Sequence, residues 1–154
     1  MTGPRWLTPA EMRAWRGFIE VVSRLNISLE ADLGLHGLTL GDYQVLVYLS
    51  ESSDRRMRMS DLAELLVLSP SGLTRRLDGL VKAGLVSRER CADDKRVTWA
   101  ELTDAGLGKL VSVAPRHVES VRRHFIDRLT KDQIDSIGEI FETLRPARAD
   151  TDPR

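Results

Sequence analysis

Apolar residues recur at steps of three and four along the first third of the chain, which is the spacing of an amphipathic helix. One stripe predicts a long helix over about 9–33, preceded by a capping box that starts at Thr8. A second stripe, behind a cap at Thr39, predicts a helix over about 40–51. The first stripe is wide for a helix that flanks a small domain, so we expect it to pack on its own domain and on another subunit.

The same pattern returns in the last third of the chain. Thr103 is a helix-capping residue, and one apolar stripe follows it as far as Leu129. This stripe predicts a single long helix that bends at Pro115, because proline removes one backbone hydrogen bond. Thr130 opens a further capping box and a last helix, and the polar tail that begins at Pro146 is expected to be disordered.

The central stretch, 59–103, changes the pattern twice. It begins with a short helix for which Ser60 is the expected cap, and Ser69 followed by Pro70 ends that helix and begins a longer one. The apolar residues of the longer helix form one buried stripe, with hydroxyl and basic side chains on the opposite face. Gly84 stands where a left-handed residue would end this helix.

A hairpin is predicted directly after the second central helix. Two strand-like runs, 86–90 and 97–102, surround a polar tip at 92–96. The segment 52–58, ahead of the first central helix, is expected to be a polar loop, and Trp99 is expected to point away from the core. The order helix, helix, hairpin is that of a winged helix-turn-helix, which places its second helix in the DNA major groove. The predicted fold class is therefore mainly α with a small β-hairpin wing.

Charge is distributed unevenly along the chain. The whole sequence holds 23 basic and 23 acidic residues and is neutral overall. Between Ser69 and Arg96 there are seven basic and four acidic residues, which gives this segment a net charge of +3. The positive charge is thus concentrated on the longer central helix and the hairpin, as the neutralisation of DNA phosphates requires.

Length and composition narrow the class of protein. The 154 residues suffice for one domain with a buried core, and 42% hydrophobic with 30% charged residues describe a globular protein. No apolar run approaches the roughly 18 residues of a membrane span, and the N-terminus lacks a signal-peptide core, so a cytoplasmic location is expected. The single cysteine, Cys91, excludes an internal disulfide.

Five short motifs, in one order and at matching spacing, resemble the MarR family of bacterial winged-helix transcriptional regulators. They are Ser60-Asp-Leu-Ala, the helix motif Ser69-x-Ser71-x-x-Thr74-Arg75, Gly84-Leu-Val-x-Arg88, the wing motif Asp94-x-Arg96, and Leu102-Thr-Asp-Ala-Gly106. The resemblance extends over roughly 8–144, where the terminal helices match by pattern rather than by motif.

The resemblance implies a homodimer in one domain. Helices within 8–34 and 104–145 would dimerise, and 39–103 would form the winged helix-turn-helix. The helix 70–83 would enter the major groove and the wing the minor groove of a pseudo-palindromic operator, most often as a repressor. Family members commonly hold a small aromatic effector between these parts, and the residues that could line such a cleft here are Trp15, Phe18, His36 and Tyr43.

The candidate DNA-binding residues lie on the second central helix and in the wing. In the family, the acid that matches Asp94 fixes the wing by pairing with an arginine, and the arginine that matches Arg96 enters the minor groove. The sequence leaves open whether Arg75 or Arg76 reads bases. The full set is Ser69, Ser71, Thr74, Arg75, Arg76, Arg88, Asp94, Lys95 and Arg96.

The sequence is also compatible with other interpretations of the central helix and of its neighbouring arginines. The helix could simply present a solvated face, and the arginines at 55, 56 and 58 either touch phosphates or are solvated. A winged helix used as a protein-interaction module is the alternative from another class. No cofactor or metal site is predicted, since His117 and His124 do not have the common ligand spacing. An enzyme is not favoured, because no spacing suggests a nucleophile–base pair.

Overall fold

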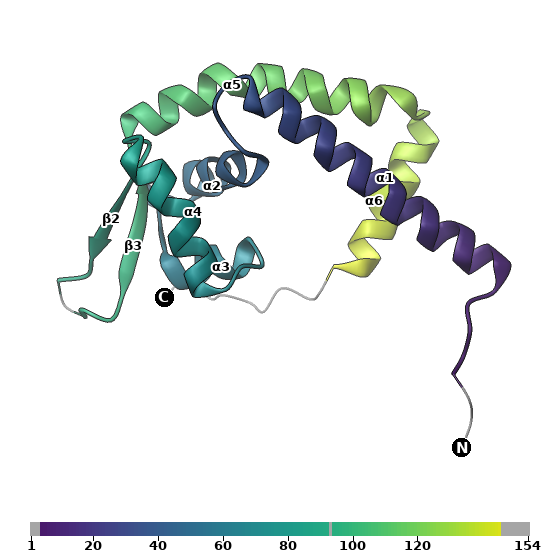
Figure 1. Ribbon diagram of the computed structural model, residues 1–154, viewed down its shortest axis with the longest axis horizontal. Coiled ribbons are helices and arrows are strands. Elements are labelled where there is room, and N and C mark those ends of the chain that lie inside the picture. Colours follow the sequence, from purple (N-terminus) through teal and green to yellow (C-terminus); the bar gives the residue numbers. More distant parts are fainter. Residues whose placement is uncertain (1–3, 93, 146–154) are drawn as a thin grey trace.

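The computed structural model describes residues 4–92 and 94–145, and its helices accompany one small sheet, whose hairpin lies at one edge of the molecule (Figure 1). The helices are α1 (Pro9–Gly34), α2 (Leu40–Glu51), α3 (Met59–Leu65), α4 (Pro70–Lys82), α5 (Asp104–His124) and α6 (Lys131–Leu144), with short 3-10 turns at Ser53–Arg55 and Ile126–Arg128. The strands are β1 (Arg56–Arg58), β2 (Val86–Arg90) and β3 (Thr98–Leu102). The predicted class, mainly α with a β-hairpin, is confirmed. The predicted tail from Pro146 lies outside the described residues.

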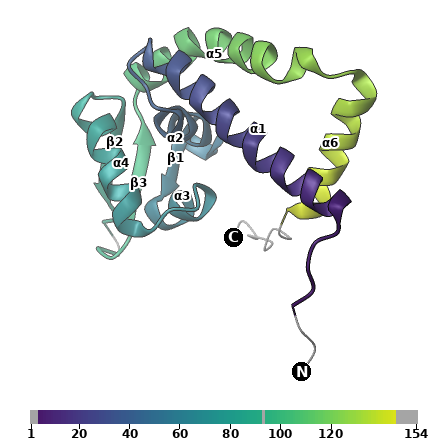
Figure 2. The ribbon, with the colours of Figure 1, turned by 45° about the vertical axis from the view of Figure 1, so that its right-hand side comes forward.

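The core lies where α2 meets α4, the sheet and the beginning of α5. Its centre is fully buried and comes from four different helices, as Leu46, Leu62, Leu77 and Val113 illustrate. Leu46, Leu62 and Leu77 belong to the apolar stripes that the sequence presents, so these stripes decide which faces of α2, α3 and α4 point inward. Helix α2 lies beneath α5, and α4 with the hairpin occupies one end of the molecule (Figures 1 and 2).

Short local signals fix most of the helix beginnings. Thr8, Thr39 and Thr130 each form a complete capping box with the side chain three residues later, and Thr103 accepts a hydrogen bond from Gly106 N. The expected cap at Ser60 is wrong. Arg58 takes the cap position and helix α3 begins at Met59, two residues earlier than a cap at Ser60 implies, while the Ser60 hydroxyl donates to the adjacent Asp61 carboxylate.

The polar loop expected at 52–58 is in part a strand. Residues Arg56–Arg58 form β1, which pairs antiparallel with β3, so the sheet has the order β1-β3-β2. Met57 lies opposite the fully buried Ala100 and packs against the core. A run of three residues is too short for its alternation to be recognised, and its partner strand lies far away in the sequence.

Helix α5 passes through Pro115 without interruption and curves over α2 (Figure 1). It ends at His124, earlier than the apolar stripe predicts. Phe125 leaves the helical conformation at φ −134° and ψ −67°, and a 3-10 turn follows. Arg122 closes this turn by an ion pair with Asp127, at 2.6 Å between Nη2 and Oδ1.

The terminal helices extend away from the winged unit and keep large apolar side chains exposed. Helix α6 has no buried residue, and the first half of α1 is almost entirely exposed. Figure 2 shows α6 and the beginning of α1 at the end of the molecule opposite the hairpin. The exposed apolar side chains include Trp15, Phe18, Ile19, Val118, Ile140, Phe141 and Leu144. Within residues 4–92 and 94–145, no helix has the length and apolar character needed to cross a membrane.

Candidate nucleic-acid interface

Helix α4 presents a polar face because its apolar stripe is anchored in the core. Leu73, Leu77 and Leu80 are buried, which turns the side chains between them outward. Ser69 caps the helix by accepting a hydrogen bond from Gly72 N at 3.1 Å, and its hydroxyl lies 3.2 Å from that of Ser71. The first turn of α4 therefore offers hydroxyl groups and the positive end of the helix dipole to an approaching phosphate.

The two adjacent arginines of α4 have different surroundings. Arg75 is exposed, and no described residue hydrogen bonds to its side chain. Arg76 is half-buried and turns back toward α2, where its Nη1 lies 3.3 Å from Thr39 Oγ1 and 3.8 Å from Asp42 Oδ1. Only Arg75 thus has its guanidinium directed to solvent from the outward face.

Arg88 joins the hairpin to α4. Its Nη2 donates to Asp78 Oδ1 of α4 at 2.7 Å, and the two form an ion pair across the angle between β2 and α4. The sequence pattern places Arg88 among the DNA-binding candidates, and the structure brings it beside α4. In this position its first effect is to hold the wing against the helix.

At the tip of the wing, the Asp94 carboxylate bonds to Arg96. Asp94 Oδ1 accepts hydrogen bonds from the backbone N of Arg96 at 3.0 Å and from its Nε at 3.1 Å. These bonds hold the pKa of the Asp94 carboxyl below its usual value, with a smaller contribution from the charge of Arg58. The Arg96 side chain is still 92% exposed, and Lys95 beside it is exposed as well. The wing therefore carries two outward cations on a tip held by Asp94.

Trp99 has a role that sequence reasoning missed. It lies on β3 opposite Arg58 of β1, and the guanidinium carbons of Arg56 and Arg58 lie 4.5 Å and 5.5 Å from its ring centroid. Arginine over an aromatic face is attracted by the ring electrons. Both arginines thus support the base of the wing, and Arg55 is bound to Asp104 at 3.0 Å. The only signal in the sequence is the Arg-Met-Arg alternation of β1.

The comparison with known proteins agrees with this geometry. The model of the MarR family matches residues 36–97, which include α2, α3, α4, β2 and the tip of the wing. AbsC, a MarR family transcriptional regulator from Streptomyces coelicolor, is 45% identical to this chain. The similarity covers 92% of this chain and 95% of AbsC, with a TM-score of 0.86. The chain belongs to the MarR family.

Two further relatives define what this MarR-family chain resembles. Sco3205, a MarR family transcriptional regulator of the same organism solved in complex with DNA, is 40% identical. The match covers 97% of both chains with a TM-score of 0.88. The transcriptional repressor YetL of Bacillus subtilis (strain 168) is 28% identical over 128 residues, which are 81% of this chain and 77% of YetL. The family and the winged-helix fold expected from the motifs are confirmed.

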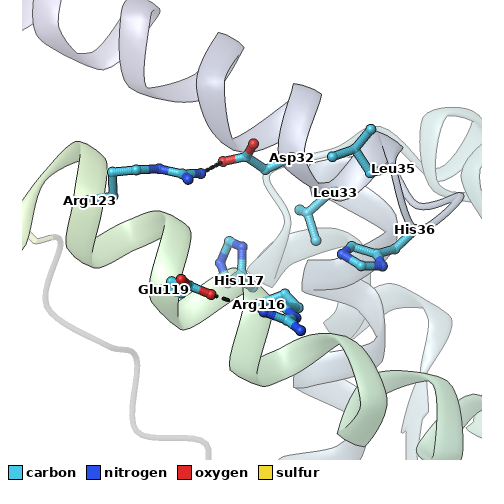
Figure 3. A pocket seen from close by; sticks show the side chains of 8 residues that line it. All are labelled: Asp32, Leu33, Leu35, His36, Arg116, His117, Glu119 and Arg123. Carbon is cyan, nitrogen blue, oxygen red and sulfur yellow. Dashed lines mark hydrogen bonds and ion pairs between the residues drawn. The ribbon is translucent and has the colours of Figure 1, made fainter.

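The four effector candidates do not form one cluster in this MarR-family chain. Trp15 and Phe18 stack on each other, with ring centroids 6.3 Å apart, on the exposed part of α1. Tyr43 is buried in the core against His117, at 4.2 Å between ring centroids, and burial raises the pKa of Tyr43. His36 lines a cavity of about 270 Å³ between the end of α1 and α5 (Figure 3).

The cavity beside His36 has charged walls. His117 lines it together with Arg116 and Glu119, and burial lowers the pKa of His117, which favours its neutral form. Its Nδ1 is buried and has no hydrogen-bond partner among the described residues. Within 4–92 and 94–145, no three histidine, cysteine or acidic side chains gather as a metal ion would require.

Asp32 connects the end of α1 to α5 at the edge of this cavity (Figure 3). Its Oδ2 accepts a hydrogen bond from Ser120, lies 2.7 Å from Arg123 Nη2, and lies 3.3 Å from His124 Nε2. The bond from Ser120, with those from Arg123 and His124, holds the pKa of the Asp32 carboxyl below its usual value. The ionised form of Asp32 is therefore the one that fastens α1 to α5.

Replacing Asp32 by asparagine is expected to lower the thermal midpoint at pH 7 by a few degrees. Because the folded-state pKa is depressed, the carboxylate stabilises the fold above the unfolded pKa of about 3.9, and this contribution is lost as the pH falls through the folded value. Thermal melts at pH 7 and near pH 3 would measure this, and the difference between the two proteins should shrink in acid.

Glu119→Gln is the matched control for this pH dependence. Glu119 pairs with Arg116 at 3.4 Å on the same helix, and both side chains are about two thirds exposed. Removal of such a surface charge should change the midpoint little. If the Asp32→Asn protein has the same thermal midpoint as wild type at pH 7, Asp32 does not stabilise the fold in this way.

Proposed function

We propose that this chain is a homodimeric transcriptional regulator that binds DNA sequence-specifically and acts as a repressor. The observation that carries the proposal is the outward face of α4 with the wing beside it. Arg75, Lys95 and Arg96 all point to solvent from a neutral protein whose positive charge is concentrated there. This is the electrostatic footprint expected of a nucleic-acid reader.

In this proposal, α4 lies in the major groove and the wing follows the adjacent minor groove. Direct contacts come from the cap and first two turns of α4 and from the wing tip, that is, from Ser69, Ser71, Thr74, Arg75, Lys95 and Arg96. Arg88 and Asp94 act by holding the wing, through the ion pair with Asp78 and the hydrogen bonds to Arg96. An arginine in a narrow minor groove is favoured by the enhanced negative potential there.

The dimer in this proposal forms through α1, α5 and α6. These helices carry the exposed apolar residues that a single chain does not bury, among them Phe18, Val118 and Phe141. A two-fold dimer requires a pseudo-palindromic operator with half-site centres about 10–10.5 base pairs apart. As a repressor it would act in the cytoplasm. A small aromatic effector would be held at the junction of α1 and α5, beside His36.

The rival proposal is a winged helix that binds proteins instead of DNA. It predicts an acidic or apolar face on α4, whereas this face carries Arg75 and Lys82, with Arg76 at its edge. The relatives are transcriptional regulators, and two of them, AbsC and Sco3205, share at least 40% of their residues with this chain. The DNA-binding proposal is the one these observations favour.

Replacing Arg75 by alanine is expected to weaken specific binding by about tenfold for each half-site, since a bidentate arginine–guanine contact contributes roughly 1–3 kcal/mol. The measurement is an anisotropy titration with the duplex that flanks this protein's own gene, at two salt concentrations. Wild type should bind in the presence of competitor DNA, and its affinity should fall steeply with salt.

Arg24→Ala is the control for the loss of one positive charge. Arg24 is exposed on α1, where it pairs with Glu20 at 3.0 Å, and α1 belongs to neither the wing nor the reading helix. This variant should bind as wild type does. If wild type binds all duplexes equally and weakly, or if Arg75→Ala leaves its binding unchanged, the proposed function is wrong.

A further inference from the structure

The guanidinium of Arg76 lies directly over the backbone of α2 at Gly41. A methyl group built on Gly41 would overlap Nη1 and Cζ of Arg76. The space that a side chain would occupy in the first turn of α2 is thus filled by the end of a side chain from α4. Gly41 is needed here because only a residue without a Cβ leaves room for this approach.

The same turn of α2 makes hydrogen bonds within itself and with side chains of both α1 and α4. Thr39 and Asp42 close their capping box across it, with 3.0 Å between Thr39 Oγ1 and Asp42 N. Glu30 of α1 accepts a hydrogen bond from Leu40 N at 2.7 Å. Arg76 then adds the contact from α4, to Thr39 Oγ1 at 3.3 Å and toward Asp42 at 3.8 Å. One turn therefore joins the long helix α1 to the reading helix α4.

We propose that Arg76 is a positioning residue that sets the orientation of α4 for DNA, by covering Gly41, and does not itself contact DNA. This inference rests on the proposed DNA-binding function and assigns different tasks to the two adjacent arginines. Arg75 extends from the outward polar face of α4. The Arg76 guanidinium is held against α2, and its side chain is only 31% exposed.

The chemistry of arginine suits this task and that of lysine does not. A guanidinium is planar, so it can lie flat on a peptide backbone while its edge donates to Thr39 and faces the Asp42 carboxylate. A lysine carries the same charge as a compact ammonium group, which cannot cover Gly41 in this way. Charge and shape can therefore be separated by a single substitution at position 76.

The decisive experiment uses Gly41→Ala, which changes no charge and leaves Arg76 in the chain. Because the added methyl meets only the flexible end of a side chain, the protein should fold and α4 should lose its support. We expect specific affinity to fall by about tenfold, and Arg76→Ala to have the same effect. The double variant Gly41→Ala/Arg76→Ala should be no weaker than either single variant, because both remove one contact.

Two further measurements separate positioning from direct contact. Arg76→Lys should bind as weakly as Arg76→Ala if shape matters, and as tightly as wild type if only the charge near DNA matters. The dependence of affinity on salt should be the same for Gly41→Ala as for wild type, since no phosphate contact is lost. Gly108→Ala, at an exposed helical position with open space around it, is the control for adding one methyl to a helix.

The outcomes are distinct for the two proposals. Wild-type affinity of Gly41→Ala, additive losses in the double variant, or recovery by Arg76→Lys would each overturn the role of Arg76 while leaving the DNA-binding function intact. Absence of competitor-resistant binding by wild type would overturn the function itself. Thermal melts of every variant at equal concentration show that the compared proteins are folded.

Discussion

Replacement of Ile140 and Phe141 by aspartate is expected to turn the dimer into a monomer and to weaken operator binding by roughly a thousandfold. The two side chains are 54% and 41% exposed on α6, a helix that buries none of its residues within the chain. Two aspartates in an apolar interface would have to lose their hydration without a partner. A monomer binds one half-site at a time and loses the gain of about 10²–10⁴ that linked sites provide.

Sedimentation or light scattering would measure the mass, and anisotropy the affinity for the operator. Ser136→Asp with Thr143→Asp is the matched control, because it adds the same charge to α6 at exposed residues beside the apolar stripe. The control protein should stay dimeric and bind DNA as wild type does. A double variant at 140 and 141 that is still a dimer would show that α6 is not part of the interface.

Gly106→Ala should lower the free energy of unfolding by about 3 kcal/mol, the upper part of the usual range for overpacking. Gly106 is buried in the first turn of α5, and a methyl there would overlap the carbonyl oxygen of Leu85. That oxygen belongs to the backbone and also accepts a hydrogen bond from Thr103 N at 3.2 Å, so it cannot move aside freely. The thermal midpoint should fall by about 6–12 °C.

Gly108→Ala serves as the control for this measurement as well, two residues further along α5. Since alanine favours helix over glycine by about 1 kcal/mol, this variant should be unchanged or more stable. Melts must be compared at one protein concentration, because dimerisation makes the midpoint depend on it. If Gly106→Ala has the same thermal midpoint as wild type, α5 and the turn before β2 are not as closely packed as described.

Local signals in the sequence predict most of the helices. The caps at Thr8, Thr39 and Thr130 each depend on a partner three residues away, so a short window contains the whole interaction. The same holds for Ser69 with Pro70 at the start of α4, and for Gly84, which has the expected positive φ of 70°. The family can also be predicted from the sequence, because its motifs are short and follow one another in a fixed order.

The remaining features depend on partners that are distant in the sequence. Strand β1 exists because β3 pairs with it and because Trp99 receives Arg56 and Arg58 on its ring. Helix α5 ends at His124 because a turn closed by the Arg122–Asp127 ion pair follows it. The apolar pattern of the sequence does not indicate this end. Sequence patterns indicate which residues prefer to be buried, and they do not indicate which distant side chain completes a contact.

The candidate site shows the same limit at the level of single residues. Hydroxyl and basic residues on α4 and in the wing could be named in advance, but the tasks of Arg75 and Arg76 could not be separated. The difference arises from Gly41, thirty-five positions before Arg76, whose missing side chain makes room for one guanidinium. Residue type alone suggests the effector candidates, and the fold separates Trp15 and Phe18 from Tyr43.

The strand order β1-β3-β2 also determines how small a working piece of this protein can be. Since β3 pairs with a strand that precedes α3 and with one that follows α4, backbone hydrogen bonds enclose both helices in a single loop. A fragment trimmed to begin at Met59 would keep every candidate DNA contact and yet leave one edge of β3 open to other chains. The shortest DNA-binding fragment that can fold must therefore begin ahead of Arg56. Its helices and wing would unfold and refold as one cooperative unit.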